Sequence, residues 1–327
     1  MAVIAVIDIG TVTARLALSE AEGGRVRLLT KVSTIVNLGE GVDQTGELKP
    51  AACQRVTDCV AGYVQKAREA GAVACCCTLT SAARDARNSG DLLARLRALG
   101  IEPEVIPGEV EGRLTFLGVA QDFLGTQILV ADNGGGSTEL ACGTLTLGGL
   151  SMDLVRSTNV GCRRITDRFL SRTDPPSQED LAAAHEFAAG LFAPVVDELR
   201  SLGAKPRRLV VCGGTATSLV AIDAGLVPYD STRVHLHELT RAQVVALQDR
   251  LGALTVAERA QVPGLQAKRA PVILAGTVAL GELMDQTGFD RMTVSESDLL
   301  VGMSLTLDAA VRGVATPVGW KPDFRGL

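Results

Sequence analysis

The sequence predicts an α/β protein made of two similar halves. Apolar runs typical of strands alternate along the chain with segments whose apolar residues follow helical spacing. A strand, an Asp-x-Gly turn with hydroxyl residues and a second strand occur twice, once at Asp8 and once at Asp132. We interpret the two copies as a duplicated unit in which each half supplies a carboxylate and a backbone turn to one shared cleft. With 327 residues, the chain is long enough for two domains, each with its own core.

The composition is that of a soluble globular protein, with 46% hydrophobic and 21% charged residues. No apolar run approaches the length needed to cross a bilayer. The N-terminus lacks a basic region and reaches Asp8 early, which predicts a first β-strand rather than a signal peptide, so we expect a cytoplasmic protein. The net charge of −5 argues against a non-specific nucleic-acid binder. A polyanionic substrate would therefore need a local basic patch.

The second turn, at residues 129–140, carries the strongest chemical signal. Three consecutive glycines can bring several backbone N–H groups close to a ligand, which predicts a phosphate-binding nest. Asp132 and Glu139 flank the glycines and would repel an anion directly, so we expect a hard cation such as Mg²⁺ to bridge these carboxylates and the phosphate. The alternative is a glycine-rich hairpin with a solvated acid at each end.

The first half continues after its hairpin with an alternation of strands and helices. A short helix carrying Arg84 and Arg87 follows a strand end, where ligands collect in open α/β sheets, although two solvated arginines would look the same. Glu109 and Glu111 lie in a first helical turn, where acids ordinarily compensate the helix dipole, but a carboxylate there can also act as a general base. The expected strands are 2–7, 14–19, 25–33, 73–79 and 104–106, and the expected helices are 50–71, 91–99 and one after Gly108.

The second half shows the same alternation of predicted strands and helices. Three basic residues within six, Arg163, Arg164 and Arg168, supply local positive charge at the start of a predicted helix. A third glycine loop at residues 212–218 again precedes a helix and is another candidate anion site. The expected strands are 127–131, 208–211 and 291–294 with a meander at 147–156, and the expected helices are 177–202, 272–284 and 298–311.

The cysteines and histidines give weaker indications of a functional site. The eight cysteines include no C-x₂-C spacing, and Cys75, Cys76 and Cys77 fall in an apolar strand. We interpret them as small buried hydrophobic residues, with redox or metal chemistry as the alternative. His235 and His237 form an H-x-H pair, which suggests a metal site but lacks an evident third ligand.

These motifs together resemble the exopolyphosphatase and guanosine pentaphosphate phosphatase family, within the actin, Hsp70 and sugar-kinase superfamily. The resemblance extends from Val6 to about Met303. The matching segments are 7–11, 38–41, 80–86, 106–114, 132–140, 161–166, 213–217, 235–240 and 258–265.

The resemblance implies two ribonuclease-H-like (actin-like) lobes with mixed five-stranded sheets flanked by helices and an active-site cleft between them. The first lobe would comprise residues 1–125, with a C-terminal helix at about 305–327 packing back on it, and the second residues 126–304. It also implies a homodimer that hydrolyses inorganic polyphosphate or guanosine pentaphosphate by in-line attack of water, releasing orthophosphate.

The resemblance also implies roles for individual residues, with Mg²⁺ as the cofactor. Glu111 matches the general base, and Glu109 ranks below it. Asp132 and Glu139 would be catalytic, and together with Asp8 they would bind the metal. The substrate would be held by Asp8, Gly10, Thr11, Arg84, Gly134, Gly135, Gly136, Ser137, Thr138, Gly213, Gly214 and Thr215.

Some features depart from the family. Thr11-Val12 replaces the usual Ser-Asn, which removes a polar contact, and Asn133 replaces an apolar residue. The chain stops before the helical domains that some members carry, so we expect a preference for short polyphosphate.

Two other functions stay open. A superfamily phosphotransferase would need an adenosine pocket around residues 213–218, and a non-catalytic sensor would bind polyphosphate or guanosine tetraphosphate.

Overall fold

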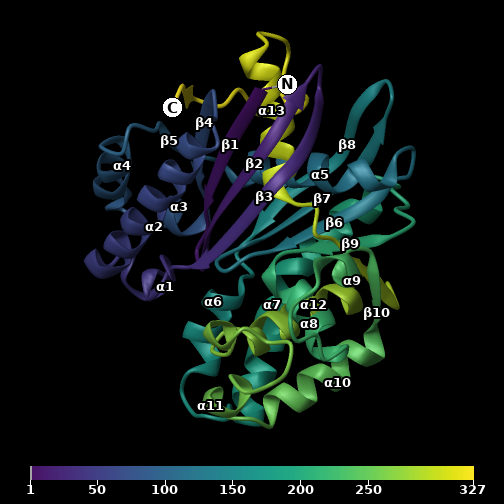
Figure 1. The fold of residues 1–327 in the computed structure, drawn as a ribbon. Helices are drawn as coiled ribbons and strands as arrows, with labels where there is room; N and C mark the ends of the chain where they lie inside the picture. Colours follow the sequence, from purple (N-terminus) through teal and green to yellow (C-terminus); the bar gives the residue numbers. More distant parts are fainter. Residues whose placement is uncertain (1) are drawn as a thin grey trace. The chain divides into compact units, whose positions relative to one another are not determined.

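The computed structural model describes residues 2–327 and divides them into two compact units, each built around a mixed sheet (Figure 1). Unit 1 comprises residues up to Gln121, Gly148–Leu150 and Asp298–Leu327, and unit 2 comprises Asp122–Leu147 and Ser151–Ser297. Each sheet has six strands, one more than the resemblance implied. In residues 2–327 no helix combines the length and apolar character needed to span a membrane.

The sheet of unit 1 is ordered β12-β4-β1-β2-β3, with β5 also paired to β4. The first three strands are antiparallel neighbours, while β4 runs parallel to β1 and β5 runs parallel to β4. The sixth strand is the two-residue β12, which covers part of the free edge of β4. The strands are β1 (Ala2–Ile9), β2 (Thr13–Glu22), β3 (Arg25–Ile35), β4 (Ala74–Leu79), β5 (Pro103–Val105) and β12 (Phe324–Arg325).

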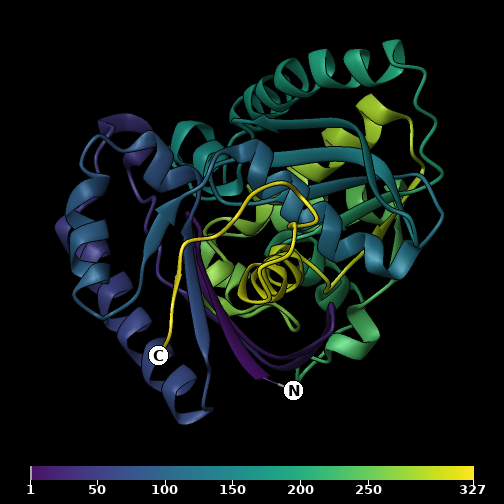
Figure 2. The same ribbon diagram turned by 90° about the horizontal axis from the view of Figure 1, so that it is seen from above.

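Helices cover both faces of this sheet because β1 is apolar on both sides. Ala5, Ile7 and Ile9 belong to the core cluster beneath α2 and α4, whereas Ile4, Val6 and Asp8 alternate with them and face the layer of α5 and α13. Figure 2 shows α13 end-on beside strands β1 to β3. The helices are α1 (Val42–Thr45), α2 (Pro50–Glu69), α3 (Ser81–Asp85), α4 (Ser89–Arg97), α5 (Gly108–Val119), the 3₁₀ turn η1 (Ala120–Phe123) and α13 (Leu299–Val311).

Helices α5 and α13 pack at very short range. A Cβ added to Gly118 would lie 2.2 Å from the carbonyl oxygen of Asp298, and one added to Gly302 would lie 1.9 Å from that of Leu114. Glycine is therefore required on both helices at their crossing. This contact fixes the beginning of α13, and with it Asp298, over the face of the sheet that carries Asp8.

The sheet of unit 2 is ordered β10-β11-β9-β6-β7-β8, and its sixth strand is the edge strand β10. Strands β6, β9 and β11 are parallel, and β6 to β8 form an antiparallel meander. The strands are β6 (Ile128–Asn133), β7 (Thr138–Thr146), β8 (Gly149–Thr158), β9 (Leu209–Cys212), β10 (His237–Thr240) and β11 (Arg291–Val294).

Helices α8 and α12 pack against this sheet, and α7 and α10 pack on α12. Helix α12 is buried along most of its length, as expected for a segment that is apolar on every side. The helices are α6 (Cys162–Ile165), the π-helical turn η2 (Thr166–Leu170), α7 (Gln178–Ser201), α8 (Gly214–Asp223), α9 (Ser231–Val234), α10 (Arg241–Gly252), α11 (Val256–Arg259), the 3₁₀ turn η3 (Ala267–Arg269) and α12 (Ile273–Thr287).

Candidate active site

In unit 1, three parallel strands end at one edge of the sheet and present most of the predicted site residues of this half. Strand β1 leads into the turn of Gly10 and Thr11, β4 leads into α3 with Arg84, and β5 leads into α5 with Glu111. The carboxyl ends of neighbouring parallel strands lie side by side, so residues far apart in sequence meet there.

The first turn is tightly closed. The Gly10 N–H donates to the carbonyl oxygen of Thr13 at 2.8 Å, and the Gly39 N–H donates to that of Thr11 at 2.8 Å. A Cβ on Gly39 would lie only 2.2 Å from Cγ2 of Thr11, so the loop after β3 presses directly on this side chain. The Thr11 side chain is buried, and its Oγ1 has no hydrogen-bond partner among the described residues. An unsatisfied hydroxyl in this position suits a phosphate oxygen.

Val12, the departure noted in the sequence, is a core residue. It is buried, and its carbonyl oxygen accepts the N–H groups of Val36 and Asn37 at 2.9 Å each. The backbone of Val12 therefore anchors the end of β3, and an apolar side chain suits this interior position.

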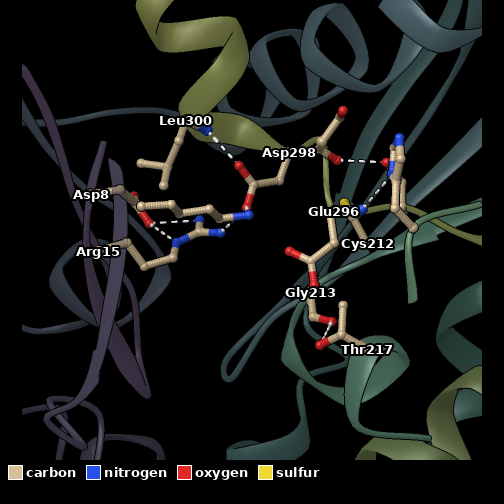
Figure 3. Close-up of polar contacts among 12 residues, drawn as sticks. Asp8, Arg15, Cys212, Gly213, Thr217, Glu296, Asp298 and Leu300 are labelled. Atoms are coloured by element: carbon tan, nitrogen blue, oxygen red, sulfur yellow. Dashed lines mark hydrogen bonds and ion pairs between the residues drawn. The ribbon is translucent and has the colours of Figure 1, made fainter. Parts of the chain in front are cut away.

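Asp8 is held by two neighbouring strands. Its Oδ2 accepts from Nε and Nη2 of Arg15, at 3.0 and 2.7 Å (Figure 3). Its Oδ1 accepts from Oγ1 of Thr78 at 3.3 Å. Arg15 stands directly opposite Asp8 in the β1–β2 register. Burial raises the pKa of Asp8 above its ordinary value, and Arg15 acts in the opposite direction.

Arg84 and Glu111 form an ion pair. The Nη1 atom of Arg84 lies 2.7 Å from Oε2 of Glu111 and also donates to the carbonyl oxygen of Ile106 at 2.9 Å. Glu111 is buried with 7% exposure, whereas Glu109 in the same helical turn is exposed. The guanidinium, fixed by the Ile106 carbonyl, holds the Glu111 carboxylate in place at the beginning of α5.

In unit 2, the central glycine loop is oriented by the start of α6. The N–H groups of Cys162 and Arg163 donate to the carbonyls of Gly134 and Gly135 at 3.0 and 2.8 Å, and Nε of Arg164 donates to that of Gly136 at 2.8 Å. Because the C=O and N–H of one peptide plane point in opposite directions, the N–H groups of Gly135, Gly136 and Ser137 point away from α6. These three N–H groups are the candidate donors of the predicted nest.

Gly161 makes this arrangement possible. A Cβ there would lie 2.3 Å from the carbonyl oxygen of Gly135 and 2.4 Å from the carbonyl carbon of Gly136. These neighbours are backbone atoms of the loop itself, so any side chain at position 161 would push the nest out of place.

Asp132 and Glu139 stand directly opposite each other on β6 and β7. Cross-strand partners project from the same face, and both carboxylates are buried, with 6% and 2% exposure. Ser157 Oγ donates to Oε1 of Glu139 at 2.7 Å. Two like charges so placed favour a cation between them, and Mg²⁺ takes one or two carboxylates together with phosphate and water oxygens, so this donor set fits it.

The third glycine loop meets the same carboxylate. Gly213 precedes α8 with a φ of 98°, and a Cβ there would lie 3.1 Å from Oδ1 of Asp132. Its carbonyl oxygen accepts from Oγ1 of Thr217 at 3.4 Å (Figure 3). The guanidinium of Arg269 packs directly on Gly214, at the position that a Cβ would occupy. Thr215 is buried and packs closely against Gly276 of α12.

The remaining sequence signals have structural explanations. Asn133 Nδ2 donates to Oγ1 of Thr138 at 2.9 Å, on the face of the sheet opposite Asp132 and Glu139. His235 Nδ1 accepts the N–H of Glu296 at 3.2 Å, so His235 holds a loop. Within residues 2–327, no three His, Cys, Asp or Glu side chains group as metal ligands.

Sequence reasoning did not select several residues that shape the site. Gly161 orients the nest, Ser157 holds Glu139, and Arg15 holds Asp8. Arg164, which the sequence indicated only as local positive charge, binds the carbonyl oxygen of Gly136. Only the contact of Arg15 could have been predicted from the sequence. A tight hairpin places the residue seven positions after Asp8 directly opposite it.

Comparison with known proteins places these motifs in a family. The model of the Ppx/GppA phosphatase family matches residues 17–307. Exopolyphosphatase 2 of Mycobacterium tuberculosis is 31% identical over 321 residues, covering 93% of this chain and 98% of its own. A bifunctional 3-dehydroquinate synthase/phosphatase of Fusobacterium nucleatum is also 31% identical, over 91% of this chain and 46% of its own.

Solved structures agree with the sequence comparison. The Ppx/GppA family member of Aquifex aeolicus is 29% identical with a TM-score of 0.75, covering 93% of this chain and 96% of its own. An exopolyphosphatase of Cytophaga hutchinsonii is 26% identical with a TM-score of 0.84, covering 97% of this chain and 100% of its own. The chain therefore belongs to the Ppx/GppA phosphatase family and is a phosphatase, that is, a hydrolase.

Proposed function

We propose that this protein is an exopolyphosphatase that releases orthophosphate stepwise from the terminus of inorganic polyphosphate with the help of Mg²⁺. The observation that carries the proposal is the nest of Gly135, Gly136 and Ser137 beside the carboxylate pair of Asp132 and Glu139. A polyanion with a cation on its oxygens is the ligand that such a combination accepts. The name of the mycobacterial relative, exopolyphosphatase 2, supports the same substrate class.

The proposed reaction is in-line attack of water on the terminal phosphoryl group. Glu111 takes the proton of the water, and its ion pair with Arg84 orients it for that task. The nest and the Thr11 hydroxyl hold phosphate oxygens. Asp132 and Glu139 would hold Mg²⁺, which would supply neutralisation of charge on the transferring phosphoryl group.

The other predicted residues complete the assignment. We assign Gly10, Gly134, Gly213, Gly214 and Thr215 to the walls of the phosphate site, on the basis of their places in the three glycine loops. The side chain of Thr138 is excluded, because it lies with Asn133 on the face of the sheet opposite Asp132 and Glu139. The cytoplasmic location and the homodimer stay predictions. Guanosine pentaphosphate ends in the same kind of phosphoanhydride bond, so we include it as a second substrate.

The test is orthophosphate release from short polyphosphate, long polyphosphate and guanosine pentaphosphate in the presence of Mg²⁺. Glu111→Gln removes the base and nearly preserves its shape, so we expect kcat to fall by about a hundredfold or more. Glu109→Gln is the matched control, because Glu109 is exposed in the same turn of α5 and should be nearly neutral.

Each outcome has a defined meaning. The best substrate of the wild type names the activity. A wild type that binds all three compounds without releasing phosphate would replace the enzyme by a sensor, and phosphate transfer to ADP would replace it by a phosphotransferase. Equal losses in Glu111→Gln and Glu109→Gln would remove Glu111 from the role of base.

A further inference from the structure

Four charged side chains of unit 1 form a chain of alternating sign. Arg15 binds Asp8 through Nε and Nη2, and its remaining terminal nitrogen, Nη1, binds Oδ2 of Asp298 at 2.9 Å. Lys31 Nζ lies 3.0 Å from the same oxygen of Asp298. Figure 3 shows the guanidinium of Arg15 between the two carboxylates. The order is Asp8, Arg15, Asp298 and Lys31, and the formal charges cancel.

The chain ties together segments that are remote in sequence. Arg15 and Lys31 come from β2 and β3, whereas Asp298 lies 283 residues beyond Arg15 and caps α13 by accepting the N–H of Leu300 at 2.9 Å. Both carboxylates are buried, with 1% exposure for Asp8 and 5% for Asp298. Buried ion pairs are stable only when their hydrogen bonds are well satisfied, and this arrangement satisfies them.

The hydrogen bonds of Asp8 leave it poorly suited to a metal. Its Oδ2 accepts two bonds from one guanidinium and its Oδ1 accepts from Thr78. A divalent cation on either oxygen would stand beside the positive charge of Arg15 in a buried position, where repulsion between cations is strong. Asp132 and Glu139 differ, because they are two acids facing each other across β6 and β7.

We propose that Asp8 anchors Arg15 and the first glycine turn and is not a ligand of Mg²⁺, and that Asp298 and Lys31 are positioning residues that hold Arg15 in place. The family resemblance implied Asp8 as a third metal ligand. The inference rests on the proposed function only in taking Asp132 and Glu139 as the metal ligands. The consequence for the site is that the rigidity of the turn at Gly10 and Thr11 depends on a contact with the beginning of α13.

The first experiment measures metal binding without any catalytic readout. Mn²⁺ alone is titrated into the protein and followed by electron paramagnetic resonance, as a spectroscopic substitute for Mg²⁺, in the wild type, Asp8→Asn and Asp132→Asn. We expect the affinity to be unchanged in Asp8→Asn and weakened by at least about tenfold in Asp132→Asn. Circular dichroism and thermal melting establish that each variant is folded.

The outcomes separate this inference from the proposed function. A loss of Mn²⁺ affinity in Asp8→Asn as large as that in Asp132→Asn would overturn the inference and leave the hydrolase proposal standing. A wild type that binds no Mn²⁺ would overturn the metal site at Asp132 and Glu139 together with this inference. Polyphosphate hydrolysis is measured separately and does not enter either result.

The second experiment tests whether Asp298 acts through Arg15. Asparagine is as good a helix N-cap as aspartate, so Asp298→Asn removes the charge and keeps the cap of α13. We expect Asp298→Asn to lower kcat/KM in the wild-type background and to have no further effect in an Arg15→Met background, as a double-mutant cycle requires for residues acting in series. Equal effects in both backgrounds would overturn the positioning role.

Arg15→Lys provides the conservative comparison. Lysine keeps the charge but cannot bind Asp8 through two nitrogens and Asp298 through a third. We therefore expect Arg15→Lys to lower kcat/KM when activity is measured well below the melting temperature of the variant. Full activity in Arg15→Lys would show that only the charge matters, which contradicts the proposal.

Discussion

The Nη1 atom of Arg84 lies 2.7 Å from Oε2 of Glu111, although 27 residues separate them in the chain. The pair forms because β4 and β5 are parallel neighbours, and the helices that follow them start at the same edge of the sheet. Nη1 of Arg84 also binds the Ile106 carbonyl, so the guanidinium is fixed at the end of β5.

This relationship predicts the effect of Arg84→Lys. A lysine is a flexible point charge and cannot reproduce the planar geometry of the guanidinium, so Glu111 loses its orientation. We expect kcat/KM for polyphosphate to fall by about tenfold to a hundredfold, as for misplaced catalytic groups. Arg87→Lys is the matched control, because Arg87 is largely exposed, with 68% side-chain exposure, and pairs with Glu47. Similar losses in both variants would contradict the prediction.

Gly161→Ala tests the support of the nest. The new Cβ would overlap the carbonyl oxygen of Gly135 at 2.3 Å, so the loop must move. A displacement of about 1 Å at a catalytic loop can reduce kcat/KM by about a hundredfold, and we expect a loss of that order. Gly190→Ala in α7 is the control, since a Cβ there meets nothing within 4 Å and should leave the rate unchanged. A normal rate in Gly161→Ala would show that the loop adapts.

We expect the contribution of Asp298 to the free energy of unfolding to depend on pH. Burial raises its pKa, but the charges of Lys31 and Arg15 outweigh burial and hold the pKa below its ordinary value. A carboxylate with a lowered pKa stabilises the folded state above its unfolded pKa of about 3.9, and this contribution is lost as the pH falls through the folded pKa.

Asp298→Asn should therefore lower the free energy of unfolding at pH 7, by about 3 kcal/mol if it behaves like other broken buried pairs. The difference between wild type and variant should shrink below about pH 4. Guanidinium unfolding at several pH values measures both quantities, and Asp290→Asn, at a side chain with 89% exposure, is the control. A difference that does not change with pH would rule out the charge as its cause.

We expect the thiols of the buried cysteines to be unreactive in the folded protein. Cys75, Cys76 and Cys77 are buried in β4, and burial raises the pKa of Cys75 to about 12 and those of its two neighbours well above their ordinary value. Reaction with a disulfide reagent requires the thiolate, so these thiols should be unreactive in the native protein. All eight cysteines should react after unfolding, whereas only the partly exposed Cys59 should react before it. Fast reaction of several thiols in the native state would contradict this packing.

Much of the fold could be predicted from local patterns. Both Asp-x-Gly hairpins, the helix after Pro50, the long helix after Ser177 and the third glycine loop occur where apolar spacing and turn residues indicated them. Ser177 caps its helix by accepting the N–H of Asp180 at 3.1 Å, as its side chain predicts. The interpretation of Cys75 to Cys77 as buried strand residues is confirmed.

Contacts between remote segments could not be predicted in this way. The sixth strand of each sheet, β12 or β10, is short and pairs at an edge, where two to four residues carry too little pattern to reveal a partner. The difference between Glu109 and Glu111 likewise depends on which side of α5 faces the protein interior.

The amino-acid sequence alone specifies which functional groups the protein carries. These are three glycine loops, the acids beside them and the apolar strands that bring them to sheet edges. The partners of those acids were set by tertiary packing. Asp8 is bound by Arg15 and Glu111 by Arg84, while Asp132 faces Glu139. The physical reason is that a charge in the interior must be satisfied by whichever groups the packing of strands and helices brings within hydrogen-bond distance, and sequence spacing does not specify that packing.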